Sequence, residues 1–162
     1  MRRIITLAAA GALLVVGGAA WAAPGEKTTG GVNYTTADEY AATVSFTAEG
    51  TPALAKGMVN FRLSREEWSF KGDVDCYYQN GNMASFTGYM DTPTTEGDIF
   101  RVIVLDQGEP APGDGQVPGT GDQIRIQRDF FEDRPNLLDC TNPDPLLRPI
   151  ESGNLQVHGG VI

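Results

Sequence analysis

Four carboxylates lie in one glycine-rich stretch, residues 106–122, and their spacing suggests a metal site. Five glycines at positions 108 to 121 allow this stretch to curve tightly. Calcium takes six to eight oxygen ligands from carboxylates and carbonyls, which such a loop could supply. The regular Asp-x-Asp-x-Asp-Gly spacing of a calcium loop is absent, however, and a solvated acidic loop is the favoured interpretation. Calcium remains an alternative, with four candidate ligands: Asp106, Glu109, Asp114 and Asp122.

Catalytic side chains are present but poorly placed for a reaction. Glu66 and Glu67 stand beside Trp68, as the carboxylates of a glycosidase stand beside an aromatic ring. Adjacent residues of a strand point to opposite faces, so these two cannot act on one bond. His158 is the single histidine, and no serine lies in a Gly-x-Ser-x-Gly elbow. We expect no enzyme activity; a small extracellular hydrolase acting on carbohydrate or peptide is the alternative.

Aromatic residues give a third candidate site. Trp68, Tyr77 and Tyr89 could form an exposed patch for a glycan or a protein partner. Neighbours such as Tyr77 and Tyr78 must face opposite sides of a strand, so part of this set is expected to pack in the core.

The chain contains two cysteines, Cys76 and Cys140. In an exported protein such a pair predicts a disulfide. The bridge would close a loop of about 65 residues and contribute about 4 kcal/mol in the chain-entropy description. Two cysteines and one histidine do not make a four-ligand zinc site. No cofactor is therefore expected, apart from the calcium alternative.

The N-terminus has the three parts of a secretory signal: the basic start Met1-Arg2-Arg3, an apolar run over residues 4–16, and small residues at positions 20 and 22. Cleavage after Ala22 is expected, with a retained membrane anchor as the alternative. The predicted organisation is a signal peptide at residues 1–22, a polar leader at 23–31 and one β-rich domain at 32–162. The predicted location is extracellular or attached to the envelope.

Charge excludes one class of partner. The 162 residues carry a formal net charge of −9. Loss of Arg2 and Arg3 with the signal leaves roughly −11 on the mature domain. Nucleic-acid binding needs a basic surface, which this composition does not favour. A cell-surface protein or a glycan is the expected kind of partner.

Alternating apolar and polar residues recur between clusters of Gly, Pro, Asn and Asp, the pattern of many short strands. Residues 42–47, 59–63 and 74–78 alternate in this way, and the last of these would place Cys76 on the inward face. Asn80-Gly81 predicts a hairpin turn between two antiparallel strands. Ala84 and Gly88 predict a close approach by a neighbouring element.

The second half of the chain continues the pattern. Residues 99–105 predict a central strand covered on both faces, and residues 123–127 and 154–158 predict two further strands. Four prolines between residues 130 and 149 predict an irregular insert before the last strand. The predicted fold is all-β, an antiparallel sandwich or flattened barrel of about seven to nine strands.

Four segments together resemble a known family: residues 56–61, 81–88, 100–110 and 153–158. The most specific are Asp106-Gln107-Gly108-Glu109-Pro110 and the closing Gly-Asn-Leu-Gln-Val-His. They resemble the small exported bacterial domains found alone or after choice-of-anchor surface modules, the post-choice-of-anchor domain. This resemblance implies a β-rich exported domain and supplies no catalytic residues. The insert with Cys140 looks longer than the corresponding link of that family, so the disulfide pairing has no family support.

From these features we expect a secreted, non-catalytic β-module with a binding or structural role at or outside the cell envelope. A calcium-stabilised adhesion domain is a further alternative to the hydrolase.

Overall fold

The computed structural model describes residues 26–64, 69–91, 98–108, 121–129, 138–143 and 146–159. Three sets of predictions lie outside these ranges: the signal peptide at residues 1–22, the motif Glu66-Glu67-Trp68, and Glu109 and Asp114 of the acidic loop.

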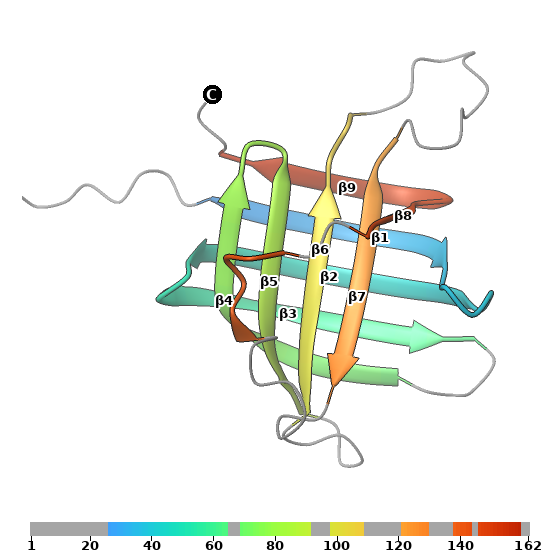
Figure 1. The fold of residues 1–162 in the computed structure, drawn as a ribbon, viewed down its shortest axis with the longest axis horizontal. Helices are drawn as coiled ribbons and strands as arrows, with labels where there is room; N and C mark the ends of the chain where they lie inside the picture. Colours follow the sequence, from blue (N-terminus) through green and yellow to red (C-terminus); the bar gives the residue numbers. More distant parts are fainter. Residues whose placement is uncertain are drawn as a thin grey trace, which may run out of the picture.

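Nine antiparallel strands form one curled sheet in the order β8-β7-β6-β5-β4-β3-β2-β1-β9 (Figure 1). The strands are β1 (Lys27–Thr35), β2 (Ala41–Thr51), β3 (Leu54–Leu63), β4 (Ser69–Asn80), β5 (Met83–Met90), β6 (Ile99–Leu105), β7 (Gln123–Asp129), β8 (Arg148–Pro149) and β9 (Ser152–His158). This architecture confirms the predicted all-β antiparallel flattened barrel. Strand β1 begins at Lys27, within the stretch 23–31 that we expected to be a polar leader, and Thr28 of this stretch is buried.

None of the described segments forms a helix of the length and apolar character needed to cross a membrane.

The sheet curls into two layers whose strands cross (Figure 1). One layer holds β9, β1, β2 and β3, and the other holds β5, β6 and β7. Strand β4 belongs to both, because residues 69–73 pair with β3 and residues 72–80 pair with β5. The turn after it is formed by Gly81 and Asn82, and the positive φ of 61° at Gly81 is the conformation that a two-residue hairpin loop needs at its first position.

The last segment of the chain joins the two ends of the sheet. Strand β8 pairs with β7, and two residues later β9 pairs with β1. Between them the Ile150 N–H donates to the Asp122 carbonyl and the Glu151 N–H donates to the Asn33 carbonyl, both at 2.9 Å. This segment therefore closes part of the barrel and limits its exposed edges.

A β-bulge in β4 corrects the predicted orientation of Cys76. Val74 pairs with Gly88 and Cys76 with Thr87, so Asp75 is an extra residue without a partner on β5. Such an insertion shifts the alternation by one position. Cys76 therefore faces outward rather than inward, and Tyr77 faces the core.

Aromatic rings fill the space between the layers. Phe70 lies between Phe61 and Phe100, with ring centroids at 5.2 and 5.7 Å. Phe86 similarly contacts Phe46 at 5.2 Å and Tyr77 at 6.5 Å. Three of these pairs are stacked and one is tilted, and such arrangements are favourable for aromatic rings.

The insert before β8 covers the outer face of β5 and β6. Cys76 and Cys140 form the predicted disulfide, with Cα atoms 5.9 Å apart. Thr87 Oγ1 donates to the Leu138 carbonyl at 2.9 Å, and Arg101 Nη2 donates to the Asp139 carbonyl at 2.7 Å. Because of this cover β6 is buried on both faces, as predicted.

Candidate binding face

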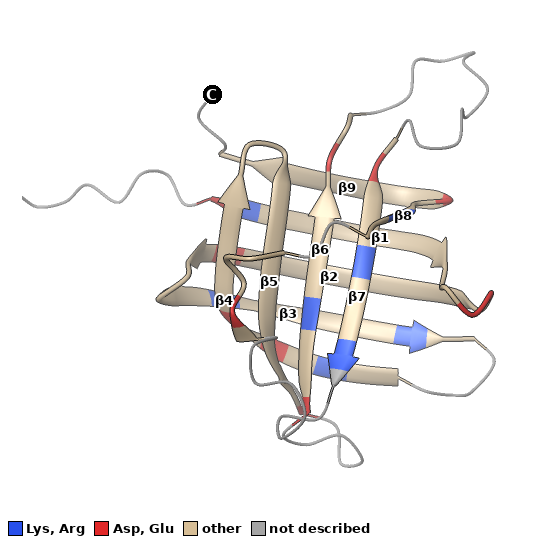
Figure 2. Cartoon of the chain, viewed as in Figure 1, with Lys and Arg blue, Asp and Glu red and all other residues tan. Residues whose placement is uncertain are grey.

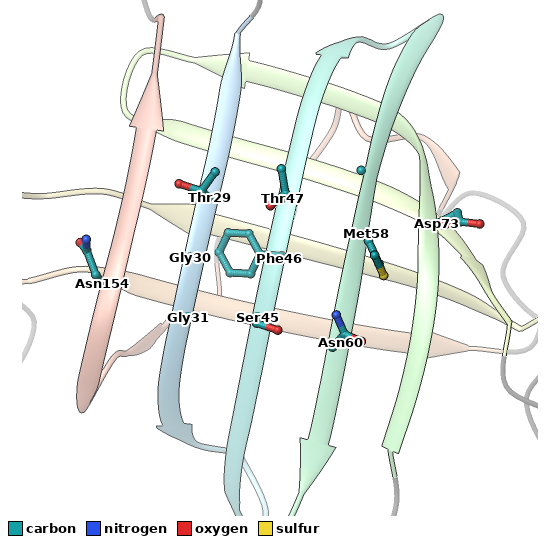
Figure 3. A pocket seen from close by; sticks show the side chains of 11 residues that line it. Thr29, Gly30, Gly31, Ser45, Phe46, Thr47, Met58, Asn60, Asp73 and Asn154 are labelled. Atoms are coloured by element: carbon teal, nitrogen blue, oxygen red, sulfur yellow. The ribbon is translucent and has the colours of Figure 1, made fainter.

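Five polar side chains gather on the outer face of the β9-β1-β2-β3 layer, which we call the polar face. Alternation puts these residues on the side away from the core. The strand register then brings them together, because Gly31 pairs with both Asn154 and Ser45, Ser45 pairs with Asn60, and Thr29 pairs with Thr47. The polar face consists of Thr29, Ser45, Thr47, Asn60 and Asn154 (Figure 3).

A hollow of about 690 Å³ lies at the centre of this face. Gly31 lies in it with no side chain, and a Cβ atom built there would meet no atom within 4 Å. Met58 and Asp73 border the hollow, and Asp73 is the one charged residue among the described residues that line it (Figure 3).

Gly30 serves a different purpose on the inner side of the same strand. A Cβ atom there would lie 2.5 Å from Cζ of Phe46, well inside van der Waals contact. Glycine at this position lets the Phe46 ring pack directly against the β1 backbone. The Gly30-Gly31 pair thus allows core packing on one face and opens the hollow on the other.

Polar side chains beside the hollow are already paired with one another. On one side Thr43 Oγ1 donates to Asn33 Oδ1 at 2.7 Å, and Asn33 Nδ2 donates to Ser152 Oγ at 3.0 Å. On the other side Glu49 forms an ion pair with Lys56, and the distance from Lys56 Nζ to Glu49 Oε1 is 2.9 Å. The hydrogen bond and charge of Lys56 lower the pKa of the Glu49 carboxyl.

The five residues of the polar face, in contrast, make no side-chain hydrogen bond to any residue that the structure describes. Their hydroxyl and amide groups can each donate and accept. The centre of the layer is thus an array of neutral hydrogen-bonding groups open to solvent, framed by groups that are already satisfied.

Two of the predicted calcium ligands lie within the described residues, and both carboxylates bind backbone N–H groups. Asp106 Oδ2 accepts from Val157 N at 2.9 Å and its Oδ1 accepts from Gly108 N at 3.0 Å. Asp122 Oδ1 accepts from Gln107 N at 3.0 Å. Asp106 thereby attaches β9 to the end of β6. Within the described ranges no three Asp, Glu, His or Cys side chains come together as a metal would require.

The predicted aromatic patch is wrong in one of its members. Tyr77 is fully buried, because the bulge at Asp75 turns it inward, where its hydroxyl bonds Thr28 Oγ1 at 2.8 Å and Gln79 Oε1 at 2.6 Å. Tyr89 is 41% exposed on β5. His158 is exposed at the end of β9 and does not line the hollow.

Sequence reasoning did not identify the polar face. Alternation predicts that Ser45, Thr47 and Asn60 face away from the core, but only strand pairing shows that Thr29 and Asn154 share this surface. The available signal was the pair of adjacent glycines at positions 30 and 31, which had been assigned to the leader.

Comparison with known proteins adds no relative: no family model, no curated protein and no solved structure matches the chain.

Proposed function

We propose that this protein is an exported, non-catalytic module that binds a neutral carbohydrate chain through the polar face. The observation that carries the proposal is the array of hydroxyl and amide groups around Gly31 with no hydrogen-bond partner among the described residues. A sugar presents several hydroxyl groups in a row, each able to donate and accept, and matches such an array without needing a charge. Met58, 49% exposed, adds an apolar contact for the C–H side of a sugar ring.

The shape of the site supports a chain rather than a small enclosed ligand. The hollow opens broadly onto the surface, and its lining residues come from five neighbouring strands, β9, β1, β2, β3 and β4 (Figure 3). An extended ligand can cross several strands and contact one or two polar groups on each. Affinity would then be distributed over several weak contacts, which suits attachment to a repetitive polymer.

Binding to a panel of neutral hexasaccharides, cellohexaose, maltohexaose and chitohexaose, tests the proposal by NMR titration and calorimetry. We expect one of them to shift the amide signals of β1, β2 and β9. Gly31→Gln should weaken this binding at least about tenfold, because the new side chain fills the hollow while its Cβ meets no atom within 4 Å. Leu54→Gln is the matched control, since Leu54 is 82% exposed and lies outside the hollow.

If none of the three sugars binds, the proposed ligand is wrong. If Gly31→Gln keeps its full affinity, the proposed site is wrong. Loss of binding in Leu54→Gln as well would assign the effect to the fold rather than the hollow.

Export is the second part of the proposal. It rests on the signal-like N-terminus and on the disulfide, which persists in oxidising compartments. Intact mass of the protein from culture medium and periplasm, before and after reduction and alkylation, tests it. We expect a mature start at Ala23 and two thiols that react only after reduction; residues 1–22 retained with free thiols would refute it.

A further inference from the structure

A second hollow, of about 300 Å³, lies on the outer surface where β2, β3 and β4 run side by side. Strand alternation points one set of side chains outward here, and the strand register brings them together. We call this the basic hollow. Its outward-facing lining residues are Thr43, Ser45, Asn60, Arg62, Ser69 and Lys71.

Arg62 and Lys71 bring two positive charges to this hollow. Arg62 pairs with Ser69 across the β3–β4 ladder, and Lys71 is the next residue of β4 on the same face. Such diagonal neighbours lie about 7–8 Å apart, a distance that long side chains can bridge. Both side chains are exposed, and Figure 2 shows the basic positions on the neighbouring strands β3 and β4. The two cations can therefore converge on one ligand group.

Neither cation forms an ion pair with a residue that the structure describes. Two carboxylates stand near Lys71 in the strand register. Asp73 lies two residues further along β4, and Asp91 N donates to the Lys71 carbonyl at 2.9 Å. Neither of these described carboxylates pairs with the Lys71 ammonium. The charge of the basic hollow is thus open to a ligand.

Open cations are unexpected in this chain, which has 21 acidic residues against 12 basic ones. Lys56, for example, pairs with Glu49 at 2.9 Å. Neighbouring like charges on a sheet repel each other, and this repulsion is relieved when an anion lies between them. Two adjacent cations without a described counterion therefore indicate an anion site.

The groups of the basic hollow favour a tetrahedral oxyanion. A phosphate or sulfate ester presents three terminal oxygen atoms. The Arg62 guanidinium can bind two of them as a fork, and the Lys71 ammonium can bind the third as a point charge. The Ser69 hydroxyl and the Asn60 amide bond no described side chain and add two donors. A carboxylate has two oxygen atoms, which Arg62 alone would satisfy.

We propose that the basic hollow binds a phosphate or sulfate ester group carried by a sugar. Ser45 and Asn60 line both this hollow and the hollow around Gly31, so a carbohydrate chain can pass from one to the other. Such a chain would be neutral where it crosses β1 and esterified where it passes β3 and β4. The sugar part of this inference rests on the proposed function, whereas the anion site rests on Arg62 and Lys71.

Five probes separate these contacts in NMR titrations of the mature, disulfide-bonded protein at low salt, where exposed charges are weakly screened. Glucose 6-phosphate and glucose 6-sulfate carry the ester, glucuronate carries a carboxylate, glucose is neutral, and inorganic phosphate lacks the sugar. We expect the tighter of the two esters to bind at least about tenfold more tightly than glucose, and at least about threefold more tightly than glucuronate or inorganic phosphate. It should shift the amide signals of residues 60–62 and 69–71.

Two variants test the assignment of residues. Arg62→Gln and Lys71→Gln should each weaken ester binding at least about fivefold, and the fold should persist because both side chains are exposed. Arg148→Gln is the matched control, since Arg148 is also exposed, lies outside the basic hollow, and gives the same change in net charge. It should keep the wild-type affinity for the ester within about twofold.

The anion site is wrong if neither ester binds more tightly than glucose. It is also wrong if Arg62→Gln and Lys71→Gln behave as Arg148→Gln does, because binding then follows net charge only. If glucuronate or inorganic phosphate binds as tightly as the esters, the assignment to a sugar ester is overturned.

The neutral hexasaccharides, measured in the same protein, distinguish this inference from the proposed function. Ester binding without hexasaccharide binding would overturn the neutral ligand of the polar face and keep the anion site. Hexasaccharide binding without a preference for the esters would overturn the basic hollow alone.

Discussion

Alanine substitutions at the two adjacent glycines of β1 should have opposite effects on stability. The added methyl group is the same in both, and so is the reduction in unfolded-chain entropy, which stabilises by about 0.4–1 kcal/mol where the native backbone tolerates alanine. The two positions differ in what the methyl group meets. At Gly30 it would lie 2.5, 3.0 and 3.1 Å from three ring atoms of Phe46, whereas at Gly31 it would meet nothing within 4 Å.

The size of the difference follows from these distances. Carbon atoms in contact prefer about 3.5–4.0 Å, so the Phe46 ring would have to retreat by about 1 Å. That ring packs against Phe86 with centroids 5.2 Å apart and has little room. Overpacking of this kind costs about 1–3 kcal/mol. Gly31→Ala should therefore be more stable than the wild type, Gly30→Ala less stable, and the difference between the variants should be about 1–3 kcal/mol.

Urea unfolding followed by circular dichroism measures both variants against the wild type, and thermal melts should separate them by roughly 3–10 °C. Taking the difference between the variants removes the shared entropy term and isolates the contact with Phe46. Equal stabilities would refute the inward and outward orientations assigned to the two glycines. A destabilised Gly31→Ala would contradict the open hollow, and with it the site of the proposed carbohydrate binding.

Three further outcomes test the closure of the barrel and its buried polar groups. Cys76→Ser combined with Cys140→Ser should lower the free energy of unfolding by up to about 4 kcal/mol in urea titrations, and a loss under about 1 kcal/mol would contradict the loop-closure argument. Asp106→Ala should cost about 1–3 kcal/mol and accelerate hydrogen exchange at the Val157 amide, whose acceptor it removes; unchanged exchange would exclude this carboxylate as the attachment of β9. Burial raises the pKa of Tyr77 to about 12 from its ordinary value of 10.0, so the stability from this phenol is complete below pH 10 and is lost as the pH rises through 12. Tyr77→Phe should flatten this alkaline decline in unfolding free energy, and an unchanged decline would assign it to other groups.

Local patterns predicted the strands well where one face is buried and the other solvated. Val44 and Phe46 of β2 and Phe61 of β3 lie in the core as their alternation indicated. The continuous apolar run of β6 correctly indicated a strand covered on both faces. These predictions succeed because side-chain alternation is a property of the strand itself and needs no knowledge of its neighbours.

The candidate sites depended on information that alternation does not contain. Thr29 and Asn154 share the polar face only because β9 pairs with β1 across more than a hundred intervening residues. Strand β8 likewise pairs with only two residues of β7, and this short pairing is part of how the two ends of the sheet meet. Long-range pairing of this kind depends on the whole barrel, so period-2 patterns could not reveal the polar face.

One inserted residue explains the errors at Cys76 and Tyr77 together. A regular β4 would turn Cys76 into the core and Tyr77 toward solvent. The insert that carries Cys140 covers the outer face, so an inward Cys76 could not reach it. Thr28 would at the same time lose the buried Tyr77 hydroxyl. The bulge at Asp75 reverses both orientations, and desolvation together with the negative charge of Asp73 raises the pKa of the Asp75 carboxyl. The bulge therefore has a small electrostatic cost at Asp75. In return it orients β4 so that Cys76 can reach Cys140 and the Tyr77 hydroxyl can bond Thr28 and Gln79 in the core.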